Sequence, residues 1–169
     1  RRFFLNRTYS NYVDKNRYLY CGTLEGLFGC SFKSKSPKKI DIPEINSDKI
    51  NSIGKDKKGN LWLSVSAKGL FILDSNYKIL NRFTIEDGLT SNDNNKLIID
   101  SKDRKWVSSN KGILVIDKNR MYRIDKSVGL LSNEIEDFYL AGDTAYIFTD
   151  KGPQQYIYNI DRKFLKREM

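Results

Sequence analysis

The hydrophobic positions of this chain fall into short runs, and polar turn residues separate the runs. One run, Leu61-Trp62-Leu63-Ser64-Val65, is followed by Ser66-Ala67-Lys68-Gly69 and then by Leu70-Phe71-Ile72-Leu73. Short runs rich in aromatic and aliphatic residues between turns are typical of β-strands. Glycine readily supplies the positive φ of a primed turn, so Lys68-Gly69 indicates a hairpin that joins two antiparallel strands.

This phrase occurs four times. Each copy places an aromatic residue six or seven positions before a hairpin glycine. The aromatic residues are Tyr20, Trp62, Trp106 and Tyr146, and the glycines are Gly26, Gly69, Gly112 and Gly152. The glycines are 43, 43 and 40 residues apart, and a second phrase, Gly-Leu-x-Ser-Asn, begins at Gly88 and again 41 residues later at Gly129. Two interleaved marks with one period indicate a structural repeat of about 42 residues.

A polar turn before each aromatic run and a further apolar run after each hairpin complete a unit of four antiparallel strands. Such sheets, repeated every 40–45 residues, are the signature of a β-propeller, because neighbouring blades must stack to cover their apolar faces. We therefore predict an all-β fold, with about four β-propeller blades in a single segment, 1–169. We place the blades at about 11–42, 45–85, 93–125 and 133–167, and residues 1–6 in the outer strand of a preceding blade. A β-sandwich would not keep the glycine period, whereas a closed four-bladed ring and an arc of a larger propeller both stay open.

Composition excludes several classes of partner. The chain has 169 residues, with 30 Lys and Arg against 21 Asp and Glu, a net charge of +9. Basic and acidic residues alternate in nearly every segment, so we expect a mixed, soluble surface and no nucleic-acid partner. No apolar run approaches the roughly 18–20 residues of a membrane span, so we expect no membrane insertion by this segment. The chain begins without methionine and within the repeat pattern, so we interpret it as a piece of a longer protein.

The residue inventory also limits the chemistry. The chain has no histidine and only two cysteines, which excludes Ser-His-Asp and Cys-His nucleophiles and histidine-containing zinc sites. Asp56, Asp100 and Asp103 lie in turns, where aspartate usually caps its own backbone, and their spacing matches no calcium loop. We therefore predict no catalytic residue, no metal site and no cofactor.

Cys21 and Cys30 flank one hairpin. If that hairpin turns at Glu25-Gly26, the two thiols face each other across the strands, close enough for a disulfide in an oxidising compartment. The equivalent pairs in the other copies would be Leu63 with Leu73, Val107 with Ile116, and Ile147 with Tyr156, all apolar. Small buried side chains therefore suit the position, and we expect free thiols, with the disulfide left open.

Two sets of residues are candidates for ligand contact. Trp62 and Trp106 resemble sugar-stacking platforms, but their equivalent mid-blade positions favour a role in core packing. The hairpin turns and the connections share one face of a propeller, and that face offers amide, acidic and ammonium groups suited to a polar or anionic sugar. These residues are Lys68, Lys111, Lys151, Asn92, Asp93, Asn94, Asn133 and Glu134. Solvated turns are polar for simpler reasons, so this alternative stays open.

The second unit resembles the two-component regulator propeller repeat. The matching residues are Asp56-Lys57-Lys58-Gly59-Asn60-Leu61-Trp62-Leu63, Lys68-Gly69-Leu70-Phe71-Ile72-Leu73-Asp74, Phe83, Asp87-Gly88-Leu89 and Ser91-Asn92. That family's pattern is an aspartate, a glycine turn, Leu-Trp-Ile-Gly-Thr, a Gly-Leu hairpin and a Gly-Leu-x-Ser-Asn connection. The resemblance covers all four units and is strongest in the second and third. Ser64 and Ser108 replace the usual glycine, and Gly152-Pro153 replaces Gly-Leu.

The resemblance implies a sensor role. Members of this family form the extracytoplasmic part of hybrid two-component receptors in Bacteroidetes, sense glycan fragments and signal to a histidine kinase. It therefore implies a non-catalytic, periplasmic segment whose partners are an oligosaccharide ligand, further propeller blades of the same receptor and a second receptor copy in a homodimer. A propeller-fold polysaccharide lyase or hydrolase fragment and a protein–protein interaction scaffold are the alternatives.

Overall fold

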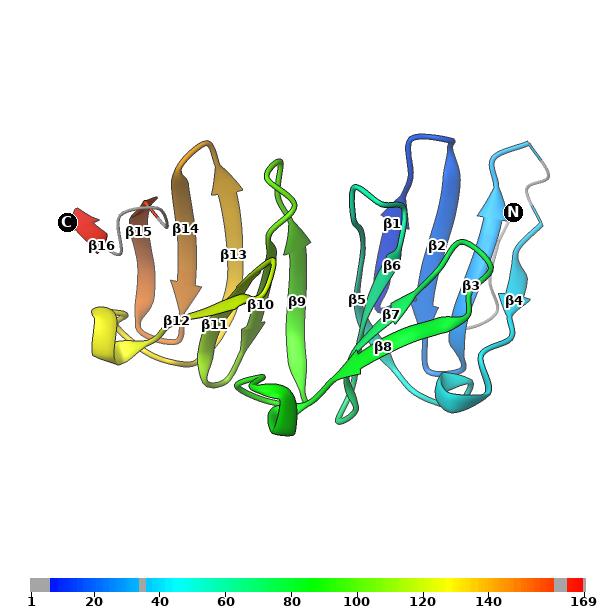
Figure 1. Cartoon of the computed structure of the whole chain (residues 1–169), viewed down its shortest axis with the longest axis horizontal. Helices are drawn as coiled ribbons and strands as arrows, with labels where there is room; N and C mark the ends of the chain where they lie inside the picture. Colours follow the sequence, from blue (N-terminus) through cyan, green and yellow to red (C-terminus); the bar gives the residue numbers. More distant parts are fainter. Residues whose placement is uncertain (1–6, 34–35, 160–163, 169) are drawn as a thin grey trace.

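The computed structural model describes residues 7–33, 36–159 and 164–168, and the strand expected over residues 1–6 lies outside them. These residues form four antiparallel sheets, each of four strands in sequential order (Figure 1). Such sheets are propeller blades, so the predicted fold class is confirmed. Three short 3-10 helices of the described chain lie in the connections between successive sheets, at Pro43–Ile45, Ile85–Asp87 and Lys126–Val128.

Each blade runs from its first to its fourth strand without crossing over. Blade 1 contains β1 (Ser10–Val13), β2 (Tyr18–Thr23), β3 (Gly26–Ser31) and β4 (Lys38–Ile40). Blade 2 contains β5 (Ile50–Lys55), β6 (Leu61–Val65), β7 (Gly69–Leu73) and β8 (Ile79–Phe83). Blade 3 contains β9 (Asn94–Ile99), β10 (Lys105–Ser109), β11 (Gly112–Asp117) and β12 (Arg120–Ile124). Blade 4 contains β13 (Ile135–Ala141), β14 (Thr144–Thr149), β15 (Gly152–Asn159) and β16 (Phe164–Glu168).

The blades stack in chain order, with the first strand of each beside the preceding blade. Figure 1 places blade 1 and blade 4 at opposite ends of the molecule, so the four described sheets form an open arc and not a closed ring. One face of blade 4 therefore has no neighbouring blade among the described residues. Tyr139 and Tyr146 are 54% and 39% exposed on that face.

Three apolar clusters fill the three junctions between blades. Trp62 lies between blades 2 and 3 and Trp106 between blades 3 and 4, with exposures of 6% and 0%. The prediction that these indoles serve as core is thus confirmed. Tyr146, their equivalent in blade 4, is exposed because no blade follows it in the described chain.

A small residue on the second strand lets the next blade approach. A Cβ atom at Gly22 would lie 2.7 Å from the Ile50 Cβ and 2.8 Å from the Ile50 carbonyl oxygen, closer than real contacts allow. Ser64 and Ser108 occupy the equivalent positions in blades 2 and 3, and both are fully buried. In blade 4 the equivalent is Phe148, which is 39% exposed. Close packing of the sheets therefore explains why this position holds glycine or serine in the first three blades.

The hairpins turn one residue earlier than the sequence suggested. Thr23 pairs with Gly26 around the two-residue turn Leu24-Glu25, and Gly26 has a φ of 92° as the first residue of β3. In blades 1, 3 and 4 neither of the two turn residues has a positive φ, so each hairpin is an ordinary turn followed by a left-handed glycine and not a primed turn. In blade 2 the turn has three residues, of which Ala67 has a φ of 57°, and Gly69 again follows the turn. The prediction of a primed turn was therefore wrong.

The same shift corrects the predicted cysteine pairing. Cys21 pairs with Phe28, and Cys30 pairs with Leu19, so the two thiols are diagonal and not opposite. Both thiols are free and buried, as expected. Burial, reinforced by the nearby Cys30, raises the pKa of the Cys21 thiol to about 11. The other predicted pairs were wrong by the same two residues, since the observed pairs are Leu63 with Phe71, Val107 with Leu114, and Ile147 with Gln154.

The Gly-Leu-x-Ser-Asn phrase builds the connection between blades. Gly88 ends a 3-10 helix with a φ of 101°, and Leu89 after it is buried. The Asn92 side-chain oxygen accepts the N–H of Ile85 at 2.9 Å, while its carbonyl accepts the N–H of Gly69 at 2.9 Å. The second copy of the phrase makes the equivalent bonds. The motif therefore ties each connection to the hairpin of the preceding blade.

Asn94 interrupts the apolar pattern of the junctions. It opens β9 where Ile50 and Ile135 open β5 and β13, each just before a bulge. Its side chain is fully buried, and neither its oxygen nor its nitrogen has a hydrogen-bond partner within the described part of the chain. A buried amide left unpaired costs stability, whereas isoleucine at this position buries only carbon.

We predict that Asn94→Ile raises the free energy of unfolding by about 1–3 kcal/mol, because it removes two unpaired buried polar atoms. Urea denaturation monitored by tryptophan fluorescence would measure the change. Ile135→Asn, which makes the reverse exchange at the equivalent position of blade 4, should lower stability. A loss of stability in Asn94→Ile would contradict the prediction and indicate that the amide is held by a partner such as a buried water.

Candidate functional site

The hairpin turns and connections do lie together, along the lower edge of the arc in Figure 1. Most of the ligand candidates on this edge are occupied in holding the fold. The Lys68 ammonium donates to the Asp48 carboxylate at 2.6 Å and to the Glu44 carbonyl at 2.8 Å. Asp93 accepts hydrogen bonds from the side chains of Ser66 and Asn51 at 3.0 and 3.4 Å.

The remaining candidates on this edge divide into two groups. Asn92 and Asn133 brace their connections, and Asn94 is buried in a junction. Lys111, Lys151 and Glu134 are exposed. The edge therefore presents only a few side chains that are available to a ligand, and they come from separate turns.

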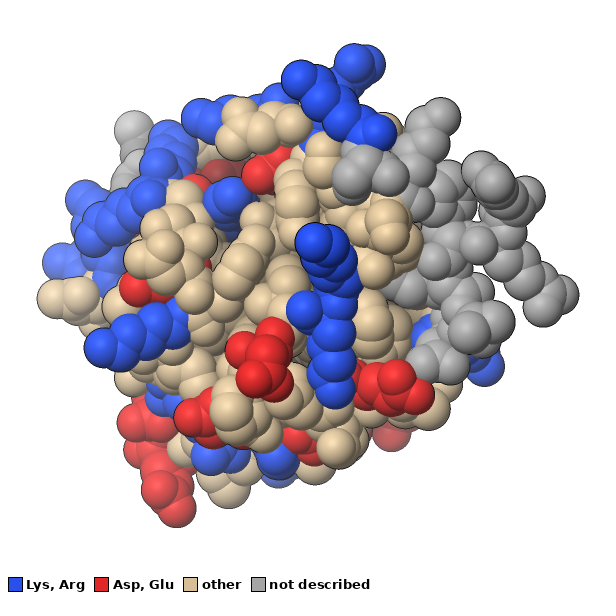
Figure 2. Space-filling model, turned by 90° about the vertical axis from the view of Figure 1, so that its right-hand side faces the viewer, with Lys and Arg blue, Asp and Glu red and all other residues tan. Residues whose placement is uncertain are grey.

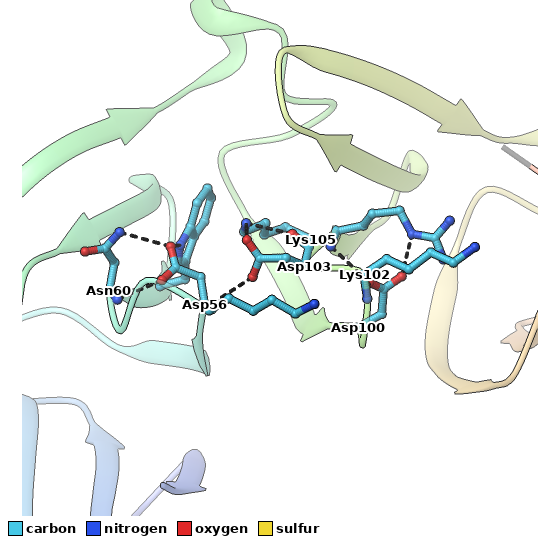
Figure 3. Close-up of polar contacts among 9 residues, drawn as sticks. Asp56, Asn60, Asp100, Lys102, Asp103 and Lys105 are labelled. Carbon is cyan, nitrogen blue, oxygen red and sulfur yellow. Dashed lines mark hydrogen bonds and ion pairs between the residues drawn. The ribbon is translucent and has the colours of Figure 1, made fainter. Parts of the chain in front are cut away.

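The opposite edge carries a repeated aspartate that the sequence analysis treated only as a turn cap. Asp14, Asp56 and Asp100 open the turns after the first strand of blades 1, 2 and 3. The side-chain oxygen Oδ1 of Asp100 accepts the backbone N–H groups of Lys102 and Arg104, each at 2.9 Å (Figure 3). The other two aspartates accept N–H groups of their own turns in the same way, as expected of turn caps.

The second oxygen of two of these aspartates binds a tryptophan, which the sequence analysis missed. Trp62 Nε1 donates to Asp56 Oδ2 at 3.1 Å, and Trp106 Nε1 donates to Asp100 Oδ2 at 3.0 Å. The only signal in the sequence is an aspartate six residues before each tryptophan. Each buried indole thus has a polar partner for its one N–H group, which fixes the ring in the junction.

Hydrogen bonding to these carboxylates lowers their pKa values. Burial acts to raise the pKa of Asp100, but the backbone N–H of Arg104, the Trp106 indole and the Arg104 guanidinium outweigh it. Burial likewise opposes the hydrogen bonds that lower the pKa of Asp56 and of Asp14. All three carboxylates are therefore anions held by donors, unsuited to act as general acids.

Ion pairs and backbone bonds connect the turns of neighbouring blades. Lys55 on β5 donates to Asp14 of blade 1 at 3.1 Å. Asp103 of blade 3 accepts the backbone N–H of Lys57 at 2.9 Å and also binds the Lys105 ammonium at 3.0 Å (Figure 3). The Lys105 ammonium nitrogen in turn lies 5.0 Å from the centre of the Trp62 ring. This edge is consequently a rigid polar surface that spans three blades.

A cavity of about 290 Å³ opens on this edge between the first turns of blades 1 and 2. The lining combines an aromatic ring with charged and amide side chains, from Tyr12, Asp14, Lys15, Asn16, Lys55, Asp56, Lys57 and Gly59. Its size and mixed lining suit a small polar ligand with one apolar face. It is our candidate functional site.

The described residues around the cavity include few groups of the kind that catalysis commonly uses. Its two carboxylates are engaged, and the chain has no histidine. Over the three described ranges, no group of three or more Cys, Asp or Glu side chains is placed to hold a metal ion.

Among the described residues, the helices are all too short to span a bilayer. Figure 2, which views the blade 1 end, shows basic side chains spread over the surface and interrupted by acidic and uncharged ones.

The structure is similar to solved extracellular domains. That of BT3049 from B. thetaiotaomicron, described as a hybrid two-component system, has a TM-score of 0.82 and 21% identity, and the match covers 97% of this chain and 23% of that chain. That of BT4673, from the same organism and described in the same way, has a TM-score of 0.72 and 14% identity, covering 96% and 25%. This chain therefore spans about a quarter of their length.

A more distant structural match is to a protein named as an enzyme. Virginiamycin B lyase of Staphylococcus aureus has a TM-score of 0.63 and 10% identity, and the match covers 90% of this chain and 56% of that chain. At these identities the likeness to solved structures establishes the fold. No protein-family model and no curated protein matches the sequence.

Asp100 should make stability depend on acid pH. Because its pKa is lowered in the folded chain, its contribution is complete above the unfolded value, near pH 4, and is lost as the pH falls through the folded value. Asp100→Asn should lower the free energy of unfolding by about 3 kcal/mol at neutral pH, because it removes the carboxylate charge that pairs with the buried Arg104 guanidinium.

The measurement is urea denaturation of both proteins from pH 7 down to pH 2, where the difference should shrink. Asp143→Asn, in the exposed turn of blade 4, serves as the control and should change little. A stability difference that stays constant over the whole pH range would show that the charge of Asp100 is not what matters.

Proposed function

We propose that this chain is a non-catalytic, ligand-binding segment of the sensor propeller of a two-component receptor, and that it binds glycan fragments. The observation that carries the proposal is the similarity of nearly the whole chain to extracellular domains of two-component systems. The chain would lie in the periplasm, as part of an inner-membrane receptor, with further blades beside it.

The cavity between blades 1 and 2 supports ligand binding within this segment. It joins the Tyr12 ring to hydrogen-bonding side chains, and sugars require both an apolar surface for their C–H groups and partners for their hydroxyls. On the edge formed by the hairpin turns and connections, Lys111, Lys151 and Glu134 are exposed and could also contact a ligand. We therefore propose the cavity as the glycan-binding site and the edge of hairpin turns and connections as the alternative site.

Signalling would follow from contacts between blades and between receptor copies. Lys55 and Asp14 bridge two blades directly at the cavity, so a ligand seated there touches both sides of one junction. A structural change at that junction would alter the contacts that these four blades make with further blades and with a second receptor copy. Binding energy could then alter how the copies are arranged.

A propeller lyase is the second candidate, and the structural match to virginiamycin B lyase favours it. The described residues argue against it, because the aspartates of the turns are engaged as anions and the chain contains no histidine. Cleavage of a polysaccharide by the intact protein would reverse this judgement.

The test is calorimetric titration of the protein with a panel of oligosaccharides from plant and animal polysaccharides. We expect at least one to bind, and Tyr12→Ala to weaken its binding about tenfold or more, because a lost stacking surface costs about 1.4 kcal/mol. Tyr139→Ala removes an exposed aromatic ring far from the cavity and should leave affinity unchanged.

Circular dichroism melting confirms that both variants fold, and mass spectrometry of the recovered oligosaccharide checks that it is not cleaved. A panel without any binder would favour the scaffold role, and a cleaved oligosaccharide would favour the enzyme.

A further inference from the structure

The two carboxylates of the cavity already accept hydrogen bonds from the protein. Asp14 Oδ1 accepts the backbone N–H groups of Asn16 and Tyr18 at 2.8 and 3.0 Å, and Oδ2 accepts the Lys55 ammonium at 3.1 Å. Asp56 is engaged in the same manner, by the backbone and side chain of Asn60 and by the Trp62 indole. A ligand therefore finds few carboxylate lone pairs to donate to.

The donors of the cavity, in contrast, are in surplus. The ammonium of Lys55 has three N–H groups, and its hydrogen bond to Asp14 uses one. Lys15, Asn16 and Lys57 line the cavity and are exposed, so their side chains can turn toward a ligand. With three lysines and two aspartates, the lining carries a formal charge of +1, from +3 and −2.

Tyr12 completes the lining with an aromatic wall. Its ring is partly buried and lies 6.4 Å from the ring of Tyr20. Burial raises the pKa of Tyr12, although the nearby Lys55 opposes the rise, so its hydroxyl stays protonated and is another donor. The apolar ring and the donors face one space that has the size of a small sugar fragment.

We propose that this cavity binds an acidic sugar, whose carboxylate or sulfate group is held by Lys55, Lys57 and Lys15 while its ring packs against Tyr12. The proposal rests on the proposed function and assigns its ligand class. An anionic group brings several acceptors and no donors, so it matches a site with spare donors and occupied acceptors. A neutral sugar brings hydroxyls that must also donate, and the site offers few free acceptors to them.

The experiment compares matched ligands by calorimetric titration of the folded chain. Oligogalacturonate is compared with its methyl ester, which has the same rings without charge, and a sulfated galactose oligomer is compared with the unsulfated oligomer. The proposal expects at least one acidic member to bind about tenfold or more tightly than its neutral partner, with affinity falling as salt is added. The two pairs distinguish a carboxylate ligand from a sulfate ligand.

Lys57→Ala tests the site itself. Its backbone N–H to Asp103 is retained, so the fold should persist while affinity for the acidic oligomer falls about fivefold or more. Lys58→Ala, the adjacent lysine outside the cavity, is the matched control and should stay within about twofold. Lys57→Arg keeps the charge and should retain most of the affinity.

Three results separate the possible failures. Equal binding of acidic and neutral members would overturn the acidic ligand class while leaving the glycan-binding function intact. Tight binding of an acidic oligomer that Lys57→Ala does not weaken would place the site elsewhere and overturn the assignment to this cavity. Absence of binding by every oligosaccharide would remove the proposed function and this inference with it.

Discussion

The structure depends on one constraint, which is that a four-stranded sheet cannot cover both of its own faces. Each junction of the arc therefore buries the face of one blade against the next, and the sheets approach closely enough that Gly22 cannot carry a side chain. The fully buried Trp106 and the equivalent Trp62 belong to the apolar clusters that fill the second and third junctions. Stability is consequently a property of neighbouring blades and not of single sheets.

Polar groups set the geometry of the two edges of this apolar stack. On one edge, asparagine and left-handed glycine fasten each connection to a hairpin. On the other, half-buried aspartates hold both their turn and the indole of the junction, so Asp56 and Asp100 join the edge to the core. Because these aspartates are satisfied internally, the lysines around them are left with donors to offer, which gives the cavity its chemical character.

The sequence pattern predicted much of the fold and less of the site. The glycine period predicted four blades, because a hairpin glycine of positive φ recurs once per blade, and the equivalent mid-blade positions of the two tryptophans predicted their burial. The strand register was missed by two residues, since Gly26 follows the turn and does not lie within it. The ligand candidates were chosen for polarity, and polarity alone does not separate Lys68, which bridges to Asp48, from an exposed lysine such as Lys111.

The sequence by itself determined the repeat, the strand order and the absence of imidazole chemistry, because these depend on residue identity and local spacing. Only the tertiary structure decided which polar groups are already paired, since that depends on atoms of different blades. It placed Lys55 against Asp14, 41 residues away, and brought Tyr12 to the same cavity. It also showed that the four described sheets form an open arc, because closure depends on the angles between sheets, which no single repeat encodes.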